Sequence, residues 1–285
     1  MKLTRETAEI YVPSGLSADV ALARTAVLGV AAHQDDLEIM ATEGILNCFG
    51  RSELWFTGVV MTDGAGSPRD GLYQSFTDEQ MQAVRREEQR KAARVGEYSA
   101  VVQLDHPSAS LKSAAERGPV SDLVSVVRAT HPVIVYTHNL ADKHDTHAAV
   151  ALRLITALRE LPADQRPDRV LGCEVWRGLD WMVDEDKVAM DVSSHESLQA
   201  ALLGVFDSQI CGGKRYDLAT LGRRRANATY AASHATDTSS GLIYAMDLTP
   251  LVVDPTRDVA SFVQERIDRL ARDVAERLRR ITGPA

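Results

Sequence analysis

An apolar segment that ends abruptly in charged and metal-binding residues decides the fold of this chain: Ala26-Val-Leu-Gly-Val-Ala-Ala-His-Gln-Asp-Asp36. Its aliphatic and β-branched residues are typical of a buried strand. His33, Asp35 and Asp36 follow at once, and burying such groups without partners is costly. We therefore expect them at the carboxyl end of the strand, where open α/β sheets bind their ligands. Taken alone, the segment fits an ordinary strand-to-helix turn with Asp36 as N-cap equally well.

The composition is that of a globular protein, with 285 residues, 45% apolar and 25% charged. The net charge of −8 argues against a broad nucleic-acid-binding surface, which would be basic. No apolar run approaches the ~20 residues of a membrane span, and the N-terminus has no apolar signal core. Three widely spaced cysteines predict free thiols in a reducing compartment. We expect a cytoplasmic protein that binds neither nucleic acid nor membranes.

Strand-like and helix-like segments alternate in the first half, which predicts βαβ units and a mostly parallel α/β sheet. The predicted strands are residues 25–32, 54–61, 100–104, 132–137 and 170–176, with a possible edge strand at 187–192. The predicted helices are residues 36–49, 120–129, 148–161 and one that begins with the capping box Thr77-Asp-Glu-Gln80 and ends at Gly96.

The second half is less regular, with helices predicted at residues 197–206 and 217–233. Apolar residues at i, i+3 and i+4 between Val259 and Ile281 predict a long amphipathic helix, which we expect to pack onto the body of the protein. There is no internal repeat and no linker. We therefore expect one domain over residues 1–285, with a core at about 25–210 and a C-terminal helical and edge-strand elaboration at 211–285.

A second polar cluster follows another apolar strand about a hundred residues later, in Tyr136-Thr-His-Asn-Leu-Ala-Asp-Lys-His-Asp-Thr-His147. His144 and His147 are three residues apart where a helix begins, so they share one of its faces. If the two strands are parallel in one sheet, both clusters lie at the same edge. This convergence favours a metal site over two unrelated turns.

The residue types in the two clusters suit metal-assisted hydrolysis of an amide. Zinc catalysis needs three protein ligands and an open position for water, and His33, Asp36 and His147 supply two imidazoles and a carboxylate. Fe(II) or Co(II) suits the same set. Asp35 is too constrained by its neighbour to share the ion, and it is suited to be the general base for a metal-activated water. His144 is placed to stabilise an oxyanion or to protonate a leaving amine.

These residues resemble the LmbE-like, or PIG-L-type, zinc-dependent N-acetylglucosaminyl deacetylases. The family pattern is a strand followed by Ala-His-Pro-Asp-Asp and later His-Pro-Asp-His, which appear here as Ala32-His-Gln-Asp-Asp36 and His144-Asp-Thr-His147. Other similarities are Thr62-Asp-Gly64, Arg85-Arg-Glu-Glu88 and Ser208-Gln209. Together these similar segments are spread over most of residues 25–230.

The resemblance implies a single Rossmann-like, three-layer deacetylase domain. It also implies a metal held by His33, Asp36 and His147, with Asp35 as base and His144 assisting the tetrahedral intermediate. The expected reaction is removal of the N-acetyl group from an N-acetylglucosamine-type sugar or its conjugate, by a protein that could form homo-oligomers. The alternatives are a zinc amidase acting on a non-sugar N-acyl substrate and a metal-binding module without turnover.

The chain departs from the family pattern at two positions. Gln34 replaces proline and adds an amide that could contact substrate. Thr146 stands where the family has an aspartate that supports the catalytic histidine, and Asp145 or Asp142 could take that role. The remaining candidate substrate contacts are Asp63, Arg69 and Asp145. A turn-forming role for Asp63 and a solvated side chain for Arg69 are the structural alternatives.

Three further predictions concern residues outside these motifs. His138 is expected to make a local hydrogen bond, with a supporting role at the metal site as the alternative. The run Arg223-Arg-Arg225 is expected to form a solvated helix face, with a phosphate contact as the alternative. Trp176 and Trp181 either stack on a sugar ring or pack in the protein.

Overall fold

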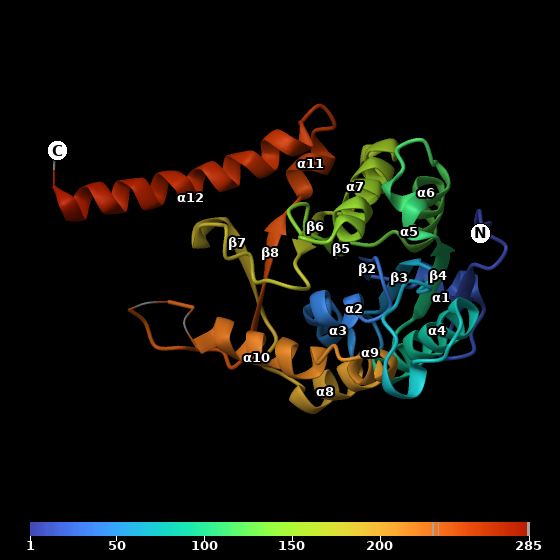
Figure 1. Cartoon of the computed structure of the whole chain (residues 1–285). Coiled ribbons are helices and arrows are strands. Elements are labelled where there is room, and N and C mark those ends of the chain that lie inside the picture. Colours follow the sequence, from blue (N-terminus) through green and yellow to red (C-terminus); the bar gives the residue numbers. More distant parts are fainter. Residues whose placement is uncertain (230, 233, 284–285) are drawn as a thin grey trace.

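A mixed β-sheet runs through the computed structural model, which describes residues 1–229, 231–232 and 234–283 (Figure 1). In this described part the sheet has eight strands in the order β1-β4-β3-β2-β5-β6-β8-β7. The strands are β1 (Glu9–Tyr11), β2 (Val27–Ala31), β3 (Phe56–Thr62), β4 (Ala100–His106), β5 (Ile134–His138), β6 (Arg169–Cys173), β7 (Lys187–Asp191) and β8 (Leu242–Asp247). The central strands β4, β3, β2, β5 and β6 are parallel, whereas β1, β8 and β7 are antiparallel to their neighbours.

Helices cover both faces of the sheet, which gives three layers with one apolar cluster on each side. One face carries α1 (Ala18–Ala23), α5 (Ser108–Lys112), α6 (Gly118–Thr130), α7 (Asp145–Glu160) and α11 (Thr249–Val253). The other carries α2 (Asp36–Met40), α3 (Thr42–Cys48), α4 (Asp78–Val95), α8 (Glu196–Gly204), α9 (Asp207–Cys211) and α10 (Tyr216–Thr229). Short 3-10 turns are η1 (Gly71–Tyr73), η2 (Ala163–Gln165) and η3 (Asp184–Asp186), and the last helix of the described residues is α12 (Val259–Thr282).

The predicted α/β fold and its mostly parallel sheet are confirmed, and they place the two polar clusters together. From β2 the chain adds β3 and β4 on one side, and then returns to add β5 and β6 on the other side. The pairing of β2 with β5 runs from Val27 and Ile134 to Val30 and Thr137, so the two strands end level with each other. Ligands of open α/β sheets bind at such a reversal of strand order.

The predicted helix at residues 36–49 is divided at Ala41 into α2 and α3. The Thr42 hydroxyl donates to the Glu38 carbonyl at 2.6 Å. Arg224 also donates to this carbonyl at 2.9 Å, and to that of Ile39 at 3.3 Å. These contacts take up carbonyls at the division, since side-chain hydrogen bonds to the backbone compete with the helix ladder. Arg224 is buried, so the prediction of a solvated arginine run is wrong at this position.

Other element boundaries follow the patterns closely. The capping box at Thr77 and the end of α4 at Gly96 are confirmed, and β7 is an edge strand as predicted. The helix predicted at 217–233 ends at Thr229, and Tyr230 and Ser233 lie outside the described residues. Neither β1 nor β8 was predicted. Because β8 lies between β6 and β7, the sheet continues into the region predicted to be a peripheral elaboration.

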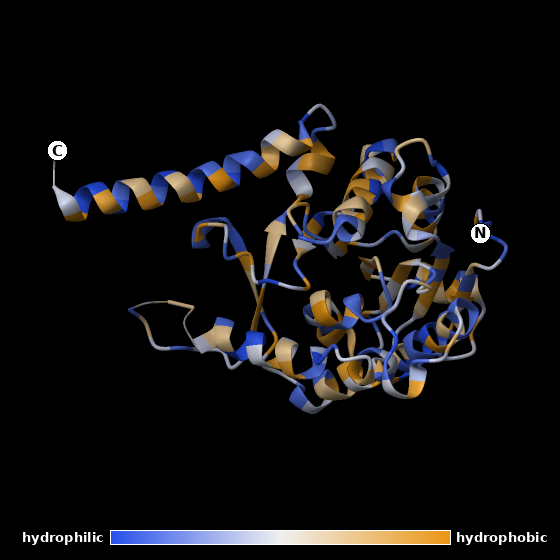
Figure 2. Cartoon of the chain, in the orientation of Figure 1, coloured by the Kyte–Doolittle hydropathy of each residue, from blue (hydrophilic) through white to orange (hydrophobic). Residues whose placement is uncertain are grey.

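The prediction that α12 packs along the body is wrong for most of its length. Only Phe262 is buried in this helix, while Ile267, Val274, Leu278 and Ile281 are between 40% and 72% exposed. The helix extends away from the rest of the molecule, and its apolar stripe is visible along it (Figures 1 and 2). The amphipathic spacing therefore predicted the helix correctly but did not predict the exposure of its apolar side chains. Across the described residues, no helix is long and apolar enough to cross a membrane.

Candidate metal centre and active site

Three side-chain atoms from the two predicted clusters meet beyond the carboxyl ends of β2 and β5. Nδ1 of His33 lies 3.1 Å from Oδ2 of Asp36 and 3.2 Å from Nε2 of His147. Nε2 of His147 is 3.4 Å from the same carboxylate oxygen. Ligands about 2.0–2.1 Å from a tetrahedral zinc ion stand roughly 3.3 Å apart. The three donors therefore have the chemistry and the spacing to hold one ion of this kind.

The turn after β2 brings the carboxylates of the adjacent residues Asp35 and Asp36 to different partners. Asp36 is the first residue of α2 rather than its N-cap, and its carboxylate accepts the His33 backbone N–H at 2.8 Å. Burial opposes ionisation of Asp36, but His147 and the other imidazoles bring its pKa well below the usual range. Asp35 occupies the cap position at φ 98°, a conformation that costs a non-glycine residue free energy and is enriched at functional sites.

A carboxylate behind His147 fixes the orientation of its ring. Oδ2 of Asp142 lies 3.1 Å from Nδ1 of His147, so Nε2 faces the centre. Oδ1 of Asp142 accepts the His144 backbone N–H at 2.9 Å, which anchors the start of α7. Such carboxylate–histidine pairs orient metal ligands and raise their basicity. The sequence left two aspartates, Asp142 and Asp145, as candidates for this role. Asp142 makes the contact, and it holds the imidazole ring of His147 rather than that of His144.

His144 stands at the N-cap of α7, at the edge of the site. Its Nδ1 accepts the Thr146 backbone N–H at 3.3 Å, so the neutral ring carries its proton on Nε2 as a hydrogen-bond donor. The ring stacks on His147 at 4.6 Å and meets His33 edge-on at 5.1 Å. Burial and the neighbouring imidazoles lower the pKa of His144, which keeps it in this neutral form at pH 7.

His138 lies beneath the metal centre, where it makes the local hydrogen bond that the sequence predicts. Its Nε2 accepts the Ala32 backbone N–H at 2.8 Å, and its ring stacks on His147 at 4.0 Å. Burial lowers the pKa of His138 to about 4, so the ring is neutral at pH 7. The atom that approaches Asp36 and His147 is already engaged with Ala32, which leaves His138 as support for the site.

Asp35 is buried against Arg85, a contact that the sequence did not predict. Nη2 of Arg85 lies 3.0 Å from Oδ2 of Asp35, and it also donates to the Gln34 carbonyl. Burial raises the pKa of the Asp35 carboxyl to about 6, although Arg85 acts in the opposite direction. Arg85 is held in turn by Glu88, which accepts from the Ser208 backbone N–H at 2.7 Å. The signal in the sequence was the run Arg85-Arg-Glu-Glu88, which resembles the family pattern but does not indicate a contact with Asp35.

The site opens into a cavity of about 330 Å³, called the catalytic cavity below. It is lined by the predicted metal ligands and by Asp35 and His144. Trp176 forms one wall, with its ring parallel to that of His147 at 6.5 Å. The ammonium groups of Lys143 and Lys214 lie 5.5 Å and 5.4 Å from the Trp176 ring. The cavity therefore combines an aromatic surface with nearby positive charge.

The candidate substrate contacts divide between this cavity and other places. Asp63 lines the cavity, and its Oδ1 also accepts the Ala65 backbone N–H at 3.1 Å in the predicted turn. Gln34 instead turns inward, is buried, and donates to the Thr62 carbonyl at 3.3 Å. Arg69 pairs with Asp78 and with the Ala65 carbonyl, and Asp145 is exposed at the start of α7. The structure thus brings only Asp63 of these four to the cavity wall.

Residues 28–158 match the model of the PIG-L family, described as GlcNAc-PI de-N-acetylase. This stretch begins in β2 and ends in α7, so it contains both clusters of the metal centre together with Asp35 and Arg85. This stretch is therefore similar to the PIG-L family, as the resemblance implied. No curated protein matches the chain in sequence.

Solved structures share the LmbE-like fold of this chain at low sequence identity. The conserved protein TT1542 from Thermus thermophilus is 18% identical over 82% of this chain and 99% of its own, with a TM-score of 0.61. The N,N'-diacetylchitobiose deacetylase from Pyrococcus horikoshii is 18% identical over 78% and 84%, with a TM-score of 0.59. The 4-carboxy-2-hydroxymuconate hydratase GalB from Pseudomonas putida KT2440 is 18% identical over 79% and 95%, with a TM-score of 0.59. Since a deacetylase and a hydratase share this fold, the fold alone does not decide the reaction.

Proposed function

We propose that this protein is a metal-dependent hydrolase that removes the N-acetyl group from an N-acetylglucosamine-type amino sugar or its conjugate. The observation that carries the proposal is the convergence of His33, Asp36 and His147 beside a separate buried carboxylate, Asp35, on one cavity. The PIG-L match supports an amide bond on an amino sugar as the target. The shared fold with a diacetylchitobiose deacetylase supports the same substrate class.

The residues of the centre suit a divalent ion, with zinc first and Fe(II) or Co(II) as alternatives. When bound, such an ion polarises an acyl carbonyl and lowers the pKa of a water molecule. Asp142 keeps the Nδ1 side of His147 occupied, so that Nε2 remains available for the ion. His138 holds the Ala32 backbone in place beneath the ligands.

Asp35 is the base in this proposal. Its carboxylate takes a proton from the attacking water, whose oxygen forms a bond to the acetyl carbon. Nε2–H of His144 donates a hydrogen bond to the carbonyl oxygen as negative charge develops there. When the carbon–nitrogen bond breaks, the proton held by Asp35 passes to the leaving nitrogen, and acetate and the free amine result. Arg85 keeps the Asp35 carboxylate in place during both proton transfers.

The pH dependence follows from the environment of Asp35. Burial raises the pKa of Asp35 to about 6, so the carboxylate is ionised above this pH and protonated below it. A protonated Asp35 cannot accept the water proton. We therefore expect kcat/KM to fall as the pH decreases through about 6.

The experiment that tests the proposal combines metal analysis with acetate release from a panel of N-acetylated sugars. The panel contains N-acetylglucosamine, diacetylchitobiose, N-acetylglucosaminyl inositol and a non-sugar N-acetyl amine. We expect a bound divalent ion, and equal amounts of acetate and free amine from at least one sugar. Acetate from the non-sugar amine alone would favour a general amidase. Bound metal without acetate from any compound would contradict a deacetylase and favour a binding module.

A further inference from the structure

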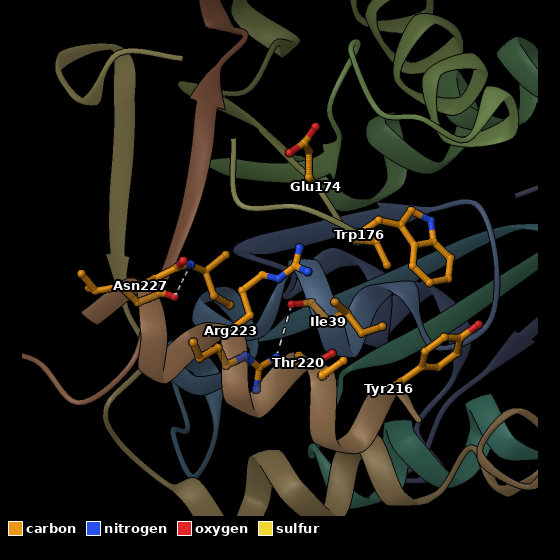
Figure 3. A pocket seen from close by; sticks show the side chains of 12 residues that line it. Ile39, Glu174, Trp176, Tyr216, Thr220, Arg223 and Asn227 are labelled. Atoms are coloured by element: carbon orange, nitrogen blue, oxygen red, sulfur yellow. Dashed lines mark hydrogen bonds between the residues drawn. The ribbon is translucent and has the colours of Figure 1, made fainter. Parts of the chain in front are cut away.

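A second and smaller cavity, whose lining side chains are drawn in Figure 3, shares residues with the catalytic cavity. Its volume is about 70 Å³, compared with about 330 Å³ for the catalytic cavity. Val175, Trp176 and Tyr216 line both cavities, so the two spaces are neighbours. The rest of its wall comes mainly from α10 and β8. We call it the Arg223 cavity, after an arginine on its wall.

The Arg223 side chain projects into this cavity. Arg223 rises from α10 toward the space between Glu174 and Trp176 (Figure 3). Its Nη1 atom is buried and has no hydrogen-bond partner among the described residues, and no carboxylate of those residues lies within 4.0 Å of its guanidinium. Nε of the neighbouring Arg224 is also buried and unpaired. Buried donors left unmatched cost free energy, so the site favours a ligand that accepts hydrogen bonds.

The acidic residue on the wall does not neutralise Arg223. The Glu174 carboxylate accepts the Leu179 backbone N–H at 2.9 Å and the indole N–H of Trp181 at 3.1 Å. It also forms an ion pair with Arg177 at 3.1 Å. In Figure 3 the carboxylate points away from Arg223. The unsatisfied side of the cavity is therefore cationic.

The remaining surface is mostly apolar and aromatic. Ile39, Leu242 and Ile243 contribute aliphatic walls, and Trp176 meets Tyr216 edge-on at 5.6 Å. A cavity of about 70 Å³ exceeds the ~10–15 Å³ that one water requires, and it suits a group of a few heavy atoms. A planar guanidinium pairs most favourably with a carboxylate or phosphate, which it contacts through two parallel N–H groups. The lining thus suits an oxyanion attached to an apolar body.

We propose that the Arg223 cavity is a subsite for an anionic group, a carboxylate or a phosphate, on the apolar distal part of the substrate whose N-acetyl amide lies in the catalytic cavity. This proposal rests on the deacetylase function proposed above. Val175, Trp176 and Tyr216 are the shared wall past which the molecule extends. Lys143 and Lys214 beside Trp176 favour the approach of the negative charge.

The test compares two N-acetylglucosamine glycosides, one of phenol and one of 4-carboxyphenol, which differ only in the anionic group. The variants are R223Q and the matched control R225Q, which removes the same charge from a 68% exposed side chain on the same helix. The measured quantity is kcat/KM for the carboxylated glycoside divided by that for the neutral one. We expect R223Q to lower this ratio by about 10- to 100-fold, as for loss of a charged hydrogen bond. R225Q should leave the ratio at its wild-type value.

Equal loss on both glycosides, or an unchanged ratio in R223Q, would overturn the subsite. Binding of free benzoate tests whether the anion is part of the substrate. If benzoate binds at Arg223 but the carboxyl group does not raise kcat/KM of the glycoside, the ligand is a separate anion and the proposal is wrong. If the wild-type protein releases acetate from neither glycoside, the deacetylase function fails on these compounds. The affinities of the same two glycosides, measured by calorimetry, then test the subsite alone. Tighter binding of the carboxylated glycoside that depends on Arg223 would support the subsite, and equal affinities would refute it.

Discussion

The two cavities share a wall but differ in how their charges are satisfied. In the catalytic cavity the side chains assigned to the chemistry form ion pairs, as His147 does with Asp142 and Asp35 does with Arg85, although Nε of Arg85 has no hydrogen-bond partner among the described residues. In the Arg223 cavity Nη1 of Arg223 is buried without a partner, and no carboxylate of the described residues lies within 4.0 Å of this guanidinium. The first arrangement holds reacting groups in fixed positions, whereas the second leaves binding capacity for a ligand.

The residues that match the PIG-L family differ in their share of the two cavities. Residues 28–158 contain all the residues to which we assign the chemistry. Apart from Ile39, the residues that line the Arg223 cavity lie beyond this stretch, at 174–176, 216–227 and 242–243. We infer that the reaction depends on residues 28–158 and that the choice of substrate depends on segments outside this stretch.

The largest effect is expected from Asp35→Asn in the catalytic cavity. The amide cannot accept the water proton, so kcat should fall by about 10²- to 10⁴-fold, while metal content stays at the wild-type level. The measurement is acetate release together with metal analysis of the same samples. Asp19→Asn is the matched control, because that side chain is 90% exposed on α1. Full activity in Asp35→Asn would remove the proposed base.

Arg224→Met tests the support that α10 gives to the junction of α2 and α3, beside the Arg223 cavity. The side chain contacts the Glu38 and Ile39 carbonyls, and it donates to the Thr42 hydroxyl at 2.6 Å and the Gln199 amide oxygen at 2.7 Å. Losing these contacts leaves buried acceptors unpaired, so we expect the free energy of unfolding to fall by roughly 2–4 kcal/mol. Denaturant unfolding measures it, with exposed Arg225→Met as the control. Equal midpoints for the two variants would refute this role.

Asp142→Asn separates metal binding from proton transfer within the catalytic cavity. The variant weakens the support of His147 while leaving Asp35 intact. We expect metal affinity to fall by about 10- to 100-fold, with kcat largely restored when the metal is saturating. Titration against a chelator gives the affinity. If affinity is unchanged and kcat alone falls, Asp142 acts in the chemistry and not on the ligand.

The smallest effect is expected from removing the part of α12 that follows Arg266, because this segment contacts neither cavity. Ile267, Val274, Leu278 and Ile281 are between 40% and 72% exposed, and Arg269 of this segment forms an ion pair with Asp186. Surface ion pairs contribute little, so the free energy of unfolding should change by less than about 1 kcal/mol. Thermal unfolding at two protein concentrations measures this. A larger loss that depends on concentration would mean that α12 packs against a second chain.

Local patterns in the sequence predicted most of the catalytic cavity. The strand before His33, the strand before His144 and the i, i+3 spacing of the two histidines are all short-range features. Parallel pairing of β2 and β5 then brings them together by a general rule of α/β sheets. The capping box at Thr77 was equally predictable, because it depends on residues three positions apart.

Long-range contacts account for what the sequence did not predict. The division of the helix at Ala41 involves Arg224, which lies more than 180 positions away along the chain. Arg85 reaches Asp35 across 50 positions, and β8 enters the sheet from a region without a clear strand pattern. The Arg223 cavity depends on α10 meeting β8 and the loop after β6, so no motif marks it. Such contacts become visible only once the fold is known.

The most direct test of the central claim is anomalous diffraction from crystals of the zinc-loaded protein, recorded on both sides of the zinc absorption edge. Our account predicts one strong anomalous peak within coordination distance of Nδ1 of His33, Oδ2 of Asp36 and Nε2 of His147. It also predicts that Asp35 remains outside this ligand set and beside Arg85. A peak on His138, a peak ligated by Asp35, or no peak among these three atoms would contradict the account.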